Sequence, residues 1–262
     1  MSSNAEEPRS PVPPPRATVV LATLNEGQNL PEVLDRLLRL PYPGIEVIVV
    51  DDGSTDGTRE HLTTVASRDP RVRSILHEGK QTTLRAQCQG IEAAHGAYVC
   101  IMDADLQHPP EMLMPMLQQL EGGASLVVAS RYAAGGTAGP RSAYRWLLSR
   151  GAEWIARLFL PSARGVSDPV SGFFAFRREI WIPLNPLYRG YKLLLFALVM
   201  AEGQRLSEVG FRFEPRGEGT SKVTGSLAFV RVFATEVLLA ARLRKEVRHR
   251  ARRAGLAAKS LA

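Results

Sequence analysis

The sequence predicts an α/β fold in which three layers form a sandwich around a mostly parallel central sheet, with an amphipathic helix towards the C-terminus. Two observations support the sheet: short apolar, β-branched runs alternate with segments of helical periodicity, and acidic residues follow several of these runs directly. A third observation supports the helix, because the last apolar stretch carries Arg231, Thr235 and Arg242 on one narrow stripe and leads into a basic cluster.

Strand and helix patterns alternate through the first half of the chain. Strands are expected at residues 17–23, 45–52, 72–77, 98–105 and 125–130, and helices at 29–40, 59–68, 83–96 and 110–123. Pro109 and Pro110 favour the start of the last of these helices, and Gly122 with Gly123 favours its end. Because such alternation builds right-handed βαβ units, most of the strands are expected to pair in parallel.

The pattern changes after Arg131. A glycine-rich loop at 133–142 precedes an expected helix at 143–159, and a turn is expected at 167–174. A helix at 191–203 and a strand at 205–213 complete the body. The length of 262 residues suits one large domain, placed here at 17–225, and the 45% of hydrophobic residues allow a sizeable core.

Both ends of the chain are expected to differ from this domain. Residues 1–16 contain acids and prolines without an apolar segment, which predicts a disordered leader and neither a signal peptide nor a membrane anchor. Residues 226–262 are expected to form an amphipathic helix and a basic tail. Cys88 and Cys100 lack the spacing of a metal site and are interpreted as core thiols of a reducing compartment.

Positive charge is concentrated in the tail. The net charge is +7 and residues 242–253 alone carry +6, so the rest of the chain is nearly neutral. This distribution argues against a nucleic-acid-binding domain and for a local anionic partner. Two interpretations of residues 226–243 stay open: a helix on an anionic membrane surface or a membrane partner subunit, and a helix packed on the body. The longest apolar run, 193–201, is about half of the ~20 residues that a bilayer span requires.

Acidic residues stand at the ends of three expected strands. Glu26 follows the first strand, Asp51 and Asp52 end the second, and Asp103 and Asp105 end the fourth. A single acidic strand end is commonly an exposed loop, but three in one parallel sheet are expected to face the same crevice. The turn DDGSTDGT after the second strand offers carboxylates to a base or a ribose, and it also supplies good residues for a helix N-cap.

The segment DADLQ at 103–107 offers oxygen ligands from alternate residues. Such ligands suit Mg²⁺ or Mn²⁺, which take one or two carboxylates together with the oxygens of a substrate diphosphate. No glycine-rich phosphate loop of the common types follows a strand in this sequence. A metal ion is therefore expected to bind the substrate phosphates, as helix N-termini do in folds that have such a loop.

Seven motifs, in this order, resemble those of family 2 glycosyltransferases of the Rossmann-like GT-A fold. They are VLATLNE, VIVVDDGSTDGT, MDADLQHPPE, SRYAAGG, DPVSGF, GYK and RGEGTSK, and they cover roughly residues 17–223. MDADLQHPPE, SRYAAGG and RGEGTSK together resemble more specifically the dolichol- or polyprenol-phosphate mannosyltransferase branch. The resemblance implies inverting transfer of a hexose, with mannose as the leading candidate, from GDP-mannose or a UDP-sugar to a polyprenyl or dolichyl monophosphate.

The resemblance also implies roles for individual residues. Those that would bind the nucleotide sugar are Thr23, Asn25, Glu26, Asp52, Lys80, Asp103, Ala104, Asp168, Arg216 and Lys222. Asp103, Asp105 and Gln107 would hold the metal ion. The acceptor phosphate would be bound by Arg131, Arg145 and Ser149, and the catalytic residues would be Asp103, Asp105, Arg131 and Arg145. Ser171 would line the sugar pocket together with Asp168.

Four features depart from the family pattern. Ala22 and Leu24 stand where a proline and a tyrosine are usual, and Phe196 stands where a glutamate is expected after GYK. The segment GKQTTLRA stands where the family commonly has Gly-Leu-Gly-like residues before the helix at 83–96, so Lys80 and Arg85 are expected to reach the nucleotide sugar instead. Without transmembrane helices, membrane contact is expected to be peripheral or through a partner, at the cytoplasmic face.

Two other functions stay open at the level of sequence. A family 2 glycosyltransferase with a soluble, non-lipid acceptor would need a catalytic base near the sugar, and Arg131 and Arg145 would then be incidental. A non-catalytic protein could bind anions through its tail, although the intact DADLQ and RGEGTSK segments argue for catalysis. A phosphate acceptor is already an anion at neutral pH and needs no base, so the enzyme would act by alignment and charge stabilisation.

Overall fold

A computed structural model describes residues 15–139, 143–214 and 227–260. Its seven strands form one sheet in the order β3-β2-β1-β4-β6-β5-β7. The strands are β1 (Ala17–Thr23), β2 (Ile45–Asp51), β3 (Val72–Leu76), β4 (Tyr98–Met102), β5 (Leu126–Ser130), β6 (Phe174–Arg177) and β7 (Leu206–Gly210). Neighbouring strands pair in parallel except at β6, which runs antiparallel to β4 and β5. The mostly parallel sheet predicted from the sequence is confirmed.

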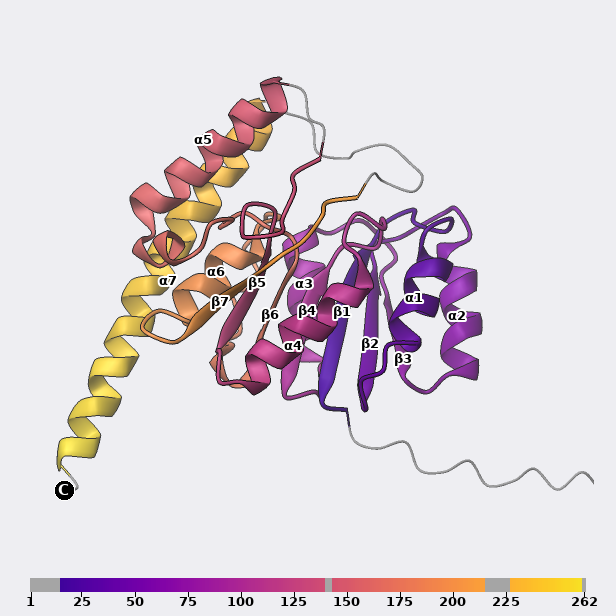
Figure 1. Ribbon diagram of the computed structural model, residues 1–262, viewed down its shortest axis with the longest axis horizontal. Coiled ribbons are helices and arrows are strands. Elements are labelled where there is room, and N and C mark those ends of the chain that lie inside the picture. The colour runs from indigo at the N-terminus through magenta and orange to yellow at the C-terminus, as the bar shows by residue number, and fades with distance from the viewer. Residues whose placement is uncertain (1–14, 140–142, 215–226, 261–262) are drawn as a thin grey trace, which may run out of the picture.

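Helices cover both faces of the sheet (Figure 1). They are α1 (Leu30–Leu38), α2 (Thr58–Arg68), α3 (Thr83–Glu92), α4 (Leu113–Glu121), α5 (Ala143–Phe159), α6 (Leu193–Met200) and α7 (Leu227–Ser260), with 3₁₀ turns η1 (Pro110–Met112), η2 (Pro161–Gly165) and η3 (Arg178–Ile180). Because side chains alternate along β1, Val20 belongs to the core cluster that includes residues of α3, α5, α6 and α7, whereas Val19 and Leu21 belong to the cluster that includes residues of α1, α2 and α4. The three-layer sandwich is thus confirmed.

Strand β6 is missing from the sequence-based prediction, which has a turn at 167–174 and no element from there to residue 190. Phe174, Ala175 and Phe176 are all buried, because β6 is inserted between β4 and β5 and is covered on both faces. A strand of four residues that is buried on both sides shows no alternation of apolar and polar residues. Its place in the sheet depends on contacts with strands far away in the sequence.

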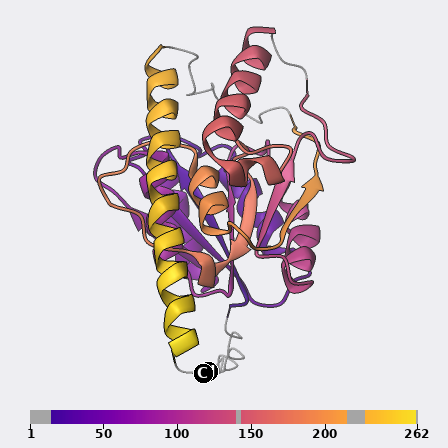
Figure 2. The ribbon, with the colours of Figure 1, turned by 90° about the vertical axis from the view of Figure 1, so that its left-hand side faces the viewer.

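The C-terminal helix α7 runs along the molecule and continues past the body (Figure 2). Its inner face packs against α6 and α5. The side chains buried on this face are Phe233, Glu236, Val237, Ala240 and Leu243. Further along, Arg244 forms a bidentate ion pair with Glu202, with N–O distances of 2.6 and 2.7 Å. Of the two interpretations left open for this helix, packing on the body is therefore observed, and no helix of the described segments is long and apolar enough to cross a bilayer.

Candidate active site

The carboxyl ends of β1, β2 and β4 lie together at the upper edge of the sheet in Figure 1. β1 pairs in parallel with β2 on one side and with β4 on the other, so the order of strands switches direction at β1. Ligands of such sheets bind at this switch, beyond the carboxyl ends of the strands. β4 ends at Met102 rather than at the expected residue 105, and the acids that follow it therefore lie outside the sheet.

The turn after β2 is built around Asp51, whose side chain is fully buried. Its carboxylate accepts hydrogen bonds from the Ser54 backbone N–H at 2.9 Å and from the Ser54 hydroxyl. It also accepts one from the Thr23 hydroxyl at 3.1 Å, which ties the end of β1 to the end of β2. Asp51 thus has a structural role. Thr23 was predicted to bind the nucleotide sugar, and its hydroxyl donates a hydrogen bond to Asp51 in this cluster.

The loop after β1 is held against this turn. Asn25, at a φ of 54°, donates its backbone N–H to Ser54 Oγ at 2.8 Å and accepts the Thr55 N–H on Oδ1 at 2.9 Å. The backbone N–H of Glu26 donates to Thr58 Oγ1 at 3.1 Å. The two loops thus lie together beyond the carboxyl ends of β1 and β2, as one wall of the crevice expected from the sequence. Asn25 and Glu26 are predicted to bind the nucleotide sugar from this position.

Asp52 is the group of this wall that is best prepared for a ligand. It is buried, yet its Oδ1 has no hydrogen-bond partner within the described segments. Burial raises the pKa of the carboxyl group above its ordinary value, and the nearby His77 and Lys80 oppose that rise. An unpartnered buried oxygen is costly unless a donor group reaches it. The N–H of a base or the hydroxyl of a ribose would satisfy Asp52.

The loop after β4 presents two carboxylates that differ in exposure. The Asp103 side chain is 49% exposed, whereas Asp105 is buried and accepts the Gln107 backbone N–H at 3.1 Å. Leu106 has a φ of 64°, in the left-handed region that few non-glycine residues adopt. The Gln107 side chain donates to the carbonyl of Glu214 at 3.4 Å, so its amide oxygen is the atom suited to a cation.

His108 holds the loop after β4 in place. The sequence analysis proposed no role for this residue. Its Nδ1 accepts the backbone N–H of Asp103 at 3.0 Å, and its ring stacks on Phe173 with 5.0 Å between centroids. Burial lowers the pKa of His108 to about 4. The ring is therefore neutral near pH 7, and a neutral imidazole can accept the Asp103 N–H, which a protonated one could not.

The oxygen donors of this loop fit a divalent cation. Asp103 and Asp105 offer carboxylates and Gln107 offers an amide oxygen, while Ala104 between them is buried. Over the described parts of the chain, no three His, Cys, Asp or Glu side chains converge as a metal cage. Mg²⁺ and Mn²⁺ commonly take one or two carboxylates and complete their shell with substrate phosphate and water. The residues present therefore suit a metal that arrives with a diphosphate better than one held by protein alone.

Across the crevice, Arg131 follows β5 and is paired with Asp168. The guanidinium donates from Nε to Oδ2 at 2.6 Å and from Nη2 to Oδ1 at 2.8 Å, and Asp168 is fully buried. Asp168 and Ser171 were both predicted to line the sugar pocket. Asp168 directs both carboxylate oxygens at Arg131. The Ser171 hydroxyl donates to the Ala129 carbonyl at 2.8 Å. The two bonds to Asp168 use Nε and Nη2 of Arg131, so Nη1 is the donor of the fork that remains for an anion.

Helix α5 carries the other residues predicted to bind the acceptor. The Ser149 hydroxyl donates to Glu153 at 3.4 Å, and Glu153 is fully buried and paired with Arg150 at 3.0 Å. The guanidinium carbons of Arg150 and Arg131 lie 5.8 and 5.4 Å from the ring centroid of Tyr132. Tyr132 thus links α5 to the Arg131 side of the crevice. The side chain of Arg145, and the whole of Arg216 and Lys222, lie outside the described residues.

Lys192 is a cation of the crevice for which the sequence analysis proposed no role. It lies directly before α6, and its ammonium donates to the carbonyl of Val170 at 2.8 Å, close to Asp168. Burial and the charge of Arg131 lower the pKa of Lys192, while Asp103 and Asp168 oppose that change. The sequence contains one signal of this placement, namely a lysine immediately before a wholly apolar helix. Such a residue must direct its charge away from the core.

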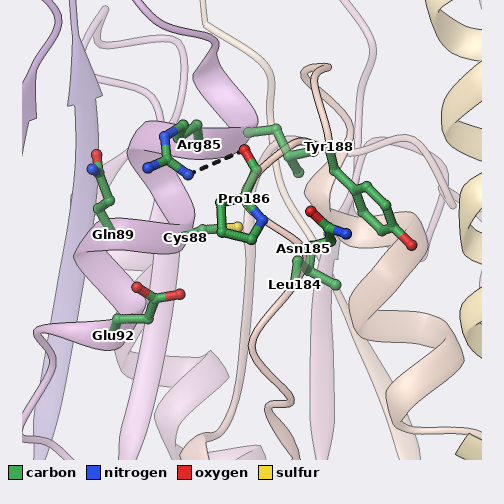
Figure 3. A pocket seen from close by; sticks show the side chains of 9 residues that line it. Arg85, Cys88, Gln89, Glu92, Leu184, Asn185, Pro186 and Tyr188 are labelled. Atoms are coloured by element: carbon green, nitrogen blue, oxygen red, sulfur yellow. Dashed lines mark hydrogen bonds between the residues drawn. The ribbon is translucent and has the colours of Figure 1, made fainter.

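Lys80 and Arg85, the two cations expected to reach the nucleotide sugar, differ in position. Lys80 is exposed and lies near enough to Asp52 to affect its pKa. Arg85 donates from Nη1 to the carbonyl of Pro186 at 3.2 Å, beside a pocket of about 120 Å³ between α3 and residues 184–188 (Figure 3). This pocket also contains Cys88, whose pKa burial raises to about 12, as suits an unreactive core thiol. Arg85 is thus engaged at α3 and not with the acids of the crevice.

Comparison with curated proteins reveals relatives over most of the chain. Residues 18–182 match the family model described as glycosyl transferase family 2. A dolichol-phosphate mannosyltransferase of Pyrococcus furiosus is 36% identical over 217 residues, which are 82% of this chain and 61% of the relative. A polyprenol monophosphomannose synthase of Mycolicibacterium smegmatis is 33% identical over 231 residues, 84% of this chain and 86% of the relative. The chain therefore spans less than two thirds of the archaeal relative's length.

Solved structures share the architecture. A glucosyl-3-phosphoglycerate synthase from Mycobacterium tuberculosis, in complex with Mn²⁺, UDP-glucose and phosphoglyceric acid, aligns with a TM-score of 0.64 at 21% identity. The alignment covers 88% of this chain and 79% of that one, and at this identity it supports the fold alone. The family match and the relatives above 30% identity go further: this chain belongs to glycosyl transferase family 2.

Proposed function

We propose that this chain is an inverting, metal-dependent glycosyltransferase that moves mannose from GDP-mannose to a polyprenyl or dolichyl monophosphate. The observation that carries the proposal is the arrangement of charge at the sheet edge. Asp52, which has an unpartnered buried oxygen, and the Asp103–Asp105 loop follow β2 and β4. The cation Arg131 follows β5, and Lys192 lies near Asp103 and Asp168. The names of the relatives support the choice of sugar and acceptor.

Each group has a defined part in this reaction. Asp52 would accept a hydrogen bond from the nucleoside, and Asp103, Asp105 and Gln107 would hold the dication. A bound dication supplies charge neutralisation to the departing nucleoside diphosphate. Nη1 of Arg131 would bind the acceptor phosphate and direct its oxygen to the face of the sugar opposite the leaving group. Because that phosphate is already anionic near pH 7, no residue has to remove a proton.

The proposal is tested by a matched set of assays on the full chain. Mannose transfer from GDP-mannose with Mn²⁺ is measured on a short polyprenyl phosphate and on the corresponding free alcohol, and the donor is then replaced by UDP-glucose. We expect transfer only to the phosphate, loss of turnover after metal chelation, and a preference for GDP-mannose. Transfer to the free alcohol at a similar rate would contradict the proposed acceptor and favour a non-lipid glycosyltransferase.

We also propose that the enzyme works at a membrane surface, on its cytoplasmic side. The outer face of α5 exposes Leu147, Trp154 and Leu158, and spacings of seven and four residues place them on one side of the helix. Trp154 is 66% exposed. Amphipathic helices with aromatic and leucine residues on one face bind the interface of a bilayer, and nearby basic residues strengthen this binding to anionic lipid.

A chain that ends at Arg248 tests the contribution of the tail. The truncation keeps the buried face of α7 and removes the basic residues Arg250, Arg252, Arg253 and Lys259. At ~1 kcal/mol for each basic residue near an anionic surface, affinity for phosphatidylserine vesicles should fall by about 100-fold or more. Turnover of a short-chain acceptor in detergent-free buffer should stay within about twofold. Equal sedimentation of both chains with these vesicles would refute a role of the tail in membrane binding, and neutral vesicles are the control.

A further inference from the structure

Glu236 reaches from the middle of α7 into the loop that carries Lys192. Its side chain is fully buried, although it is a carboxyl group on the apolar face of the helix. Oε1 accepts the backbone N–H groups of both Tyr191 and Lys192, each at 2.6 Å. Because α6 begins at the next residue, Leu193, the carboxyl group occupies the N-terminus of α6, where backbone N–H groups otherwise lack partners.

The same loop is fixed from its other side. The carbonyl of Gly190 accepts the backbone N–H of Leu84 in the first turn of α3, at 3.0 Å. A Cβ atom on Gly190 would lie 2.1 Å from Oε1 of Glu236, so a side chain at this position would displace the carboxyl group. Residues 190–192 are thus held between α3 and α7. The ammonium of Lys192 extends from this held backbone to the Val170 carbonyl.

We propose that Glu236 is a positioning residue for the transfer reaction, which holds the 190–192 backbone so that the Lys192 ammonium stays in the crevice near Asp103 and Asp168. This makes α7 part of the catalytic unit. The residue after GYK at which a glutamate is expected is Phe196, which is fully buried in the core. The carboxyl group that contacts this loop belongs to Glu236 of α7. The inference rests on the proposed function, because Lys192 matters only if the crevice binds anionic substrates.

Gly190 and Glu236 allow the same contact to be broken from two sides. In Glu236→Ala and in Gly190→Ala, turnover should fall by about 10- to 100-fold, and the double variant should be no worse than either single one because both remove one contact. Glu236→Gln should keep most of the activity, since its amide oxygen can accept both N–H groups. Arg244→Ala, which loosens α7 at Glu202 and leaves the loop alone, is the control and should change turnover less than twofold.

Hydrogen exchange separates this inference from the proposed function. The Tyr191 and Lys192 amides should exchange at least tenfold faster in Glu236→Ala, and unchanged exchange would overturn the inference whatever the enzyme transfers. Faster exchange with wild-type turnover would overturn it as well, because the loop would then not need to be held. If the wild-type chain transfers no mannose to polyprenyl phosphate, the proposed function fails. The inference is then decided by the affinity for GDP with Mn²⁺. This affinity should fall about tenfold in Glu236→Ala, and an unchanged affinity would overturn the inference.

The pH dependence of stability gives a second readout of Glu236. Burial raises its pKa from 4.5 to about 7, while the Lys192 and Tyr191 amides and the Lys192 charge oppose that rise. The folded protein therefore binds a proton more tightly than the unfolded chain, so the contribution of Glu236 to stability decreases as pH rises from about 4.5 to about 7. The melting temperature of the wild type should fall over this window relative to that of Glu236→Gln. A constant difference would contradict the buried contact, and Glu202→Gln is the control.

Discussion

Asp105→Asn is expected to lower mannosyl turnover by about 100- to 1,000-fold, the usual effect of losing one preorganised electrostatic group. Asparagine has almost the same shape and can still accept the Gln107 N–H that Asp105 accepts at 3.1 Å. The variant therefore changes the charge offered to a dication while it keeps the loop. Initial rates at a series of Mn²⁺ concentrations are the measurement, and the concentration for half-maximal rate should rise together with the loss of turnover.

Asp69→Asn is the matched control for this variant. Asp69 precedes β3 at the opposite edge of the sheet, where it pairs with Arg71 at 2.7 Å. Its replacement removes a carboxylate of the same kind and should leave both turnover and the Mn²⁺ dependence within about twofold of the wild type. If Asp105→Asn behaved like Asp69→Asn, the metal role of the DADLQ loop would be wrong.

Arg131→Met is expected to abolish transfer and also to reduce the free energy of unfolding by about 3–5 kcal/mol. The large stability effect arises because Asp168 is fully buried and both its oxygens accept from Arg131, at 2.6 and 2.8 Å. Removal of the guanidinium leaves a buried carboxylate without its partner. Denaturant unfolding and transfer rates are measured on the same preparations.

The double variant Arg131→Met with Asp168→Asn separates the two effects. It removes the unpaired charge, so most of the lost stability should return, whereas transfer should stay below about 1% of wild type because no fork remains for the acceptor phosphate. Arg131→Lys should fall between these variants, since an ammonium keeps the charge and loses the bidentate geometry. Recovery of turnover in the double variant would show that Arg131 serves only to hold the fold.

The sheet could be predicted from sequence because its information is local. The residues of β1, β2, β4 and β5 are apolar runs that end in a change of composition, and helical periodicity separates them. β6 could not be found in this way, because its burial depends on β4 and β5 on either side. The convergence of the acids after β1, β2 and β4 followed from the parallel pairing of these strands.

Contacts between distant residues explain what the sequence analysis missed in the site. The pairing of Arg131 with Asp168 and the support of Asp103 by His108 follow from the way loops fold onto one another. Glu236 lies three residues after Phe233 and four before Ala240, and this spacing already places it on the apolar stripe of the stretch. A carboxyl group on such a stripe needs a buried partner, and this signal was available before the structure.

One measurement addresses the central claim directly, namely that carboxylates beyond the strand ends hold the dication of the departing nucleotide. Crystals of the full chain grown with GDP and Mn²⁺ would be measured at a wavelength where manganese scatters anomalously. We expect one strong peak about 2 Å from carboxylate oxygens of Asp103 or Asp105 and in contact with the diphosphate. A manganese peak away from residues 103–107, with the nucleotide bound in the crevice, would contradict the account.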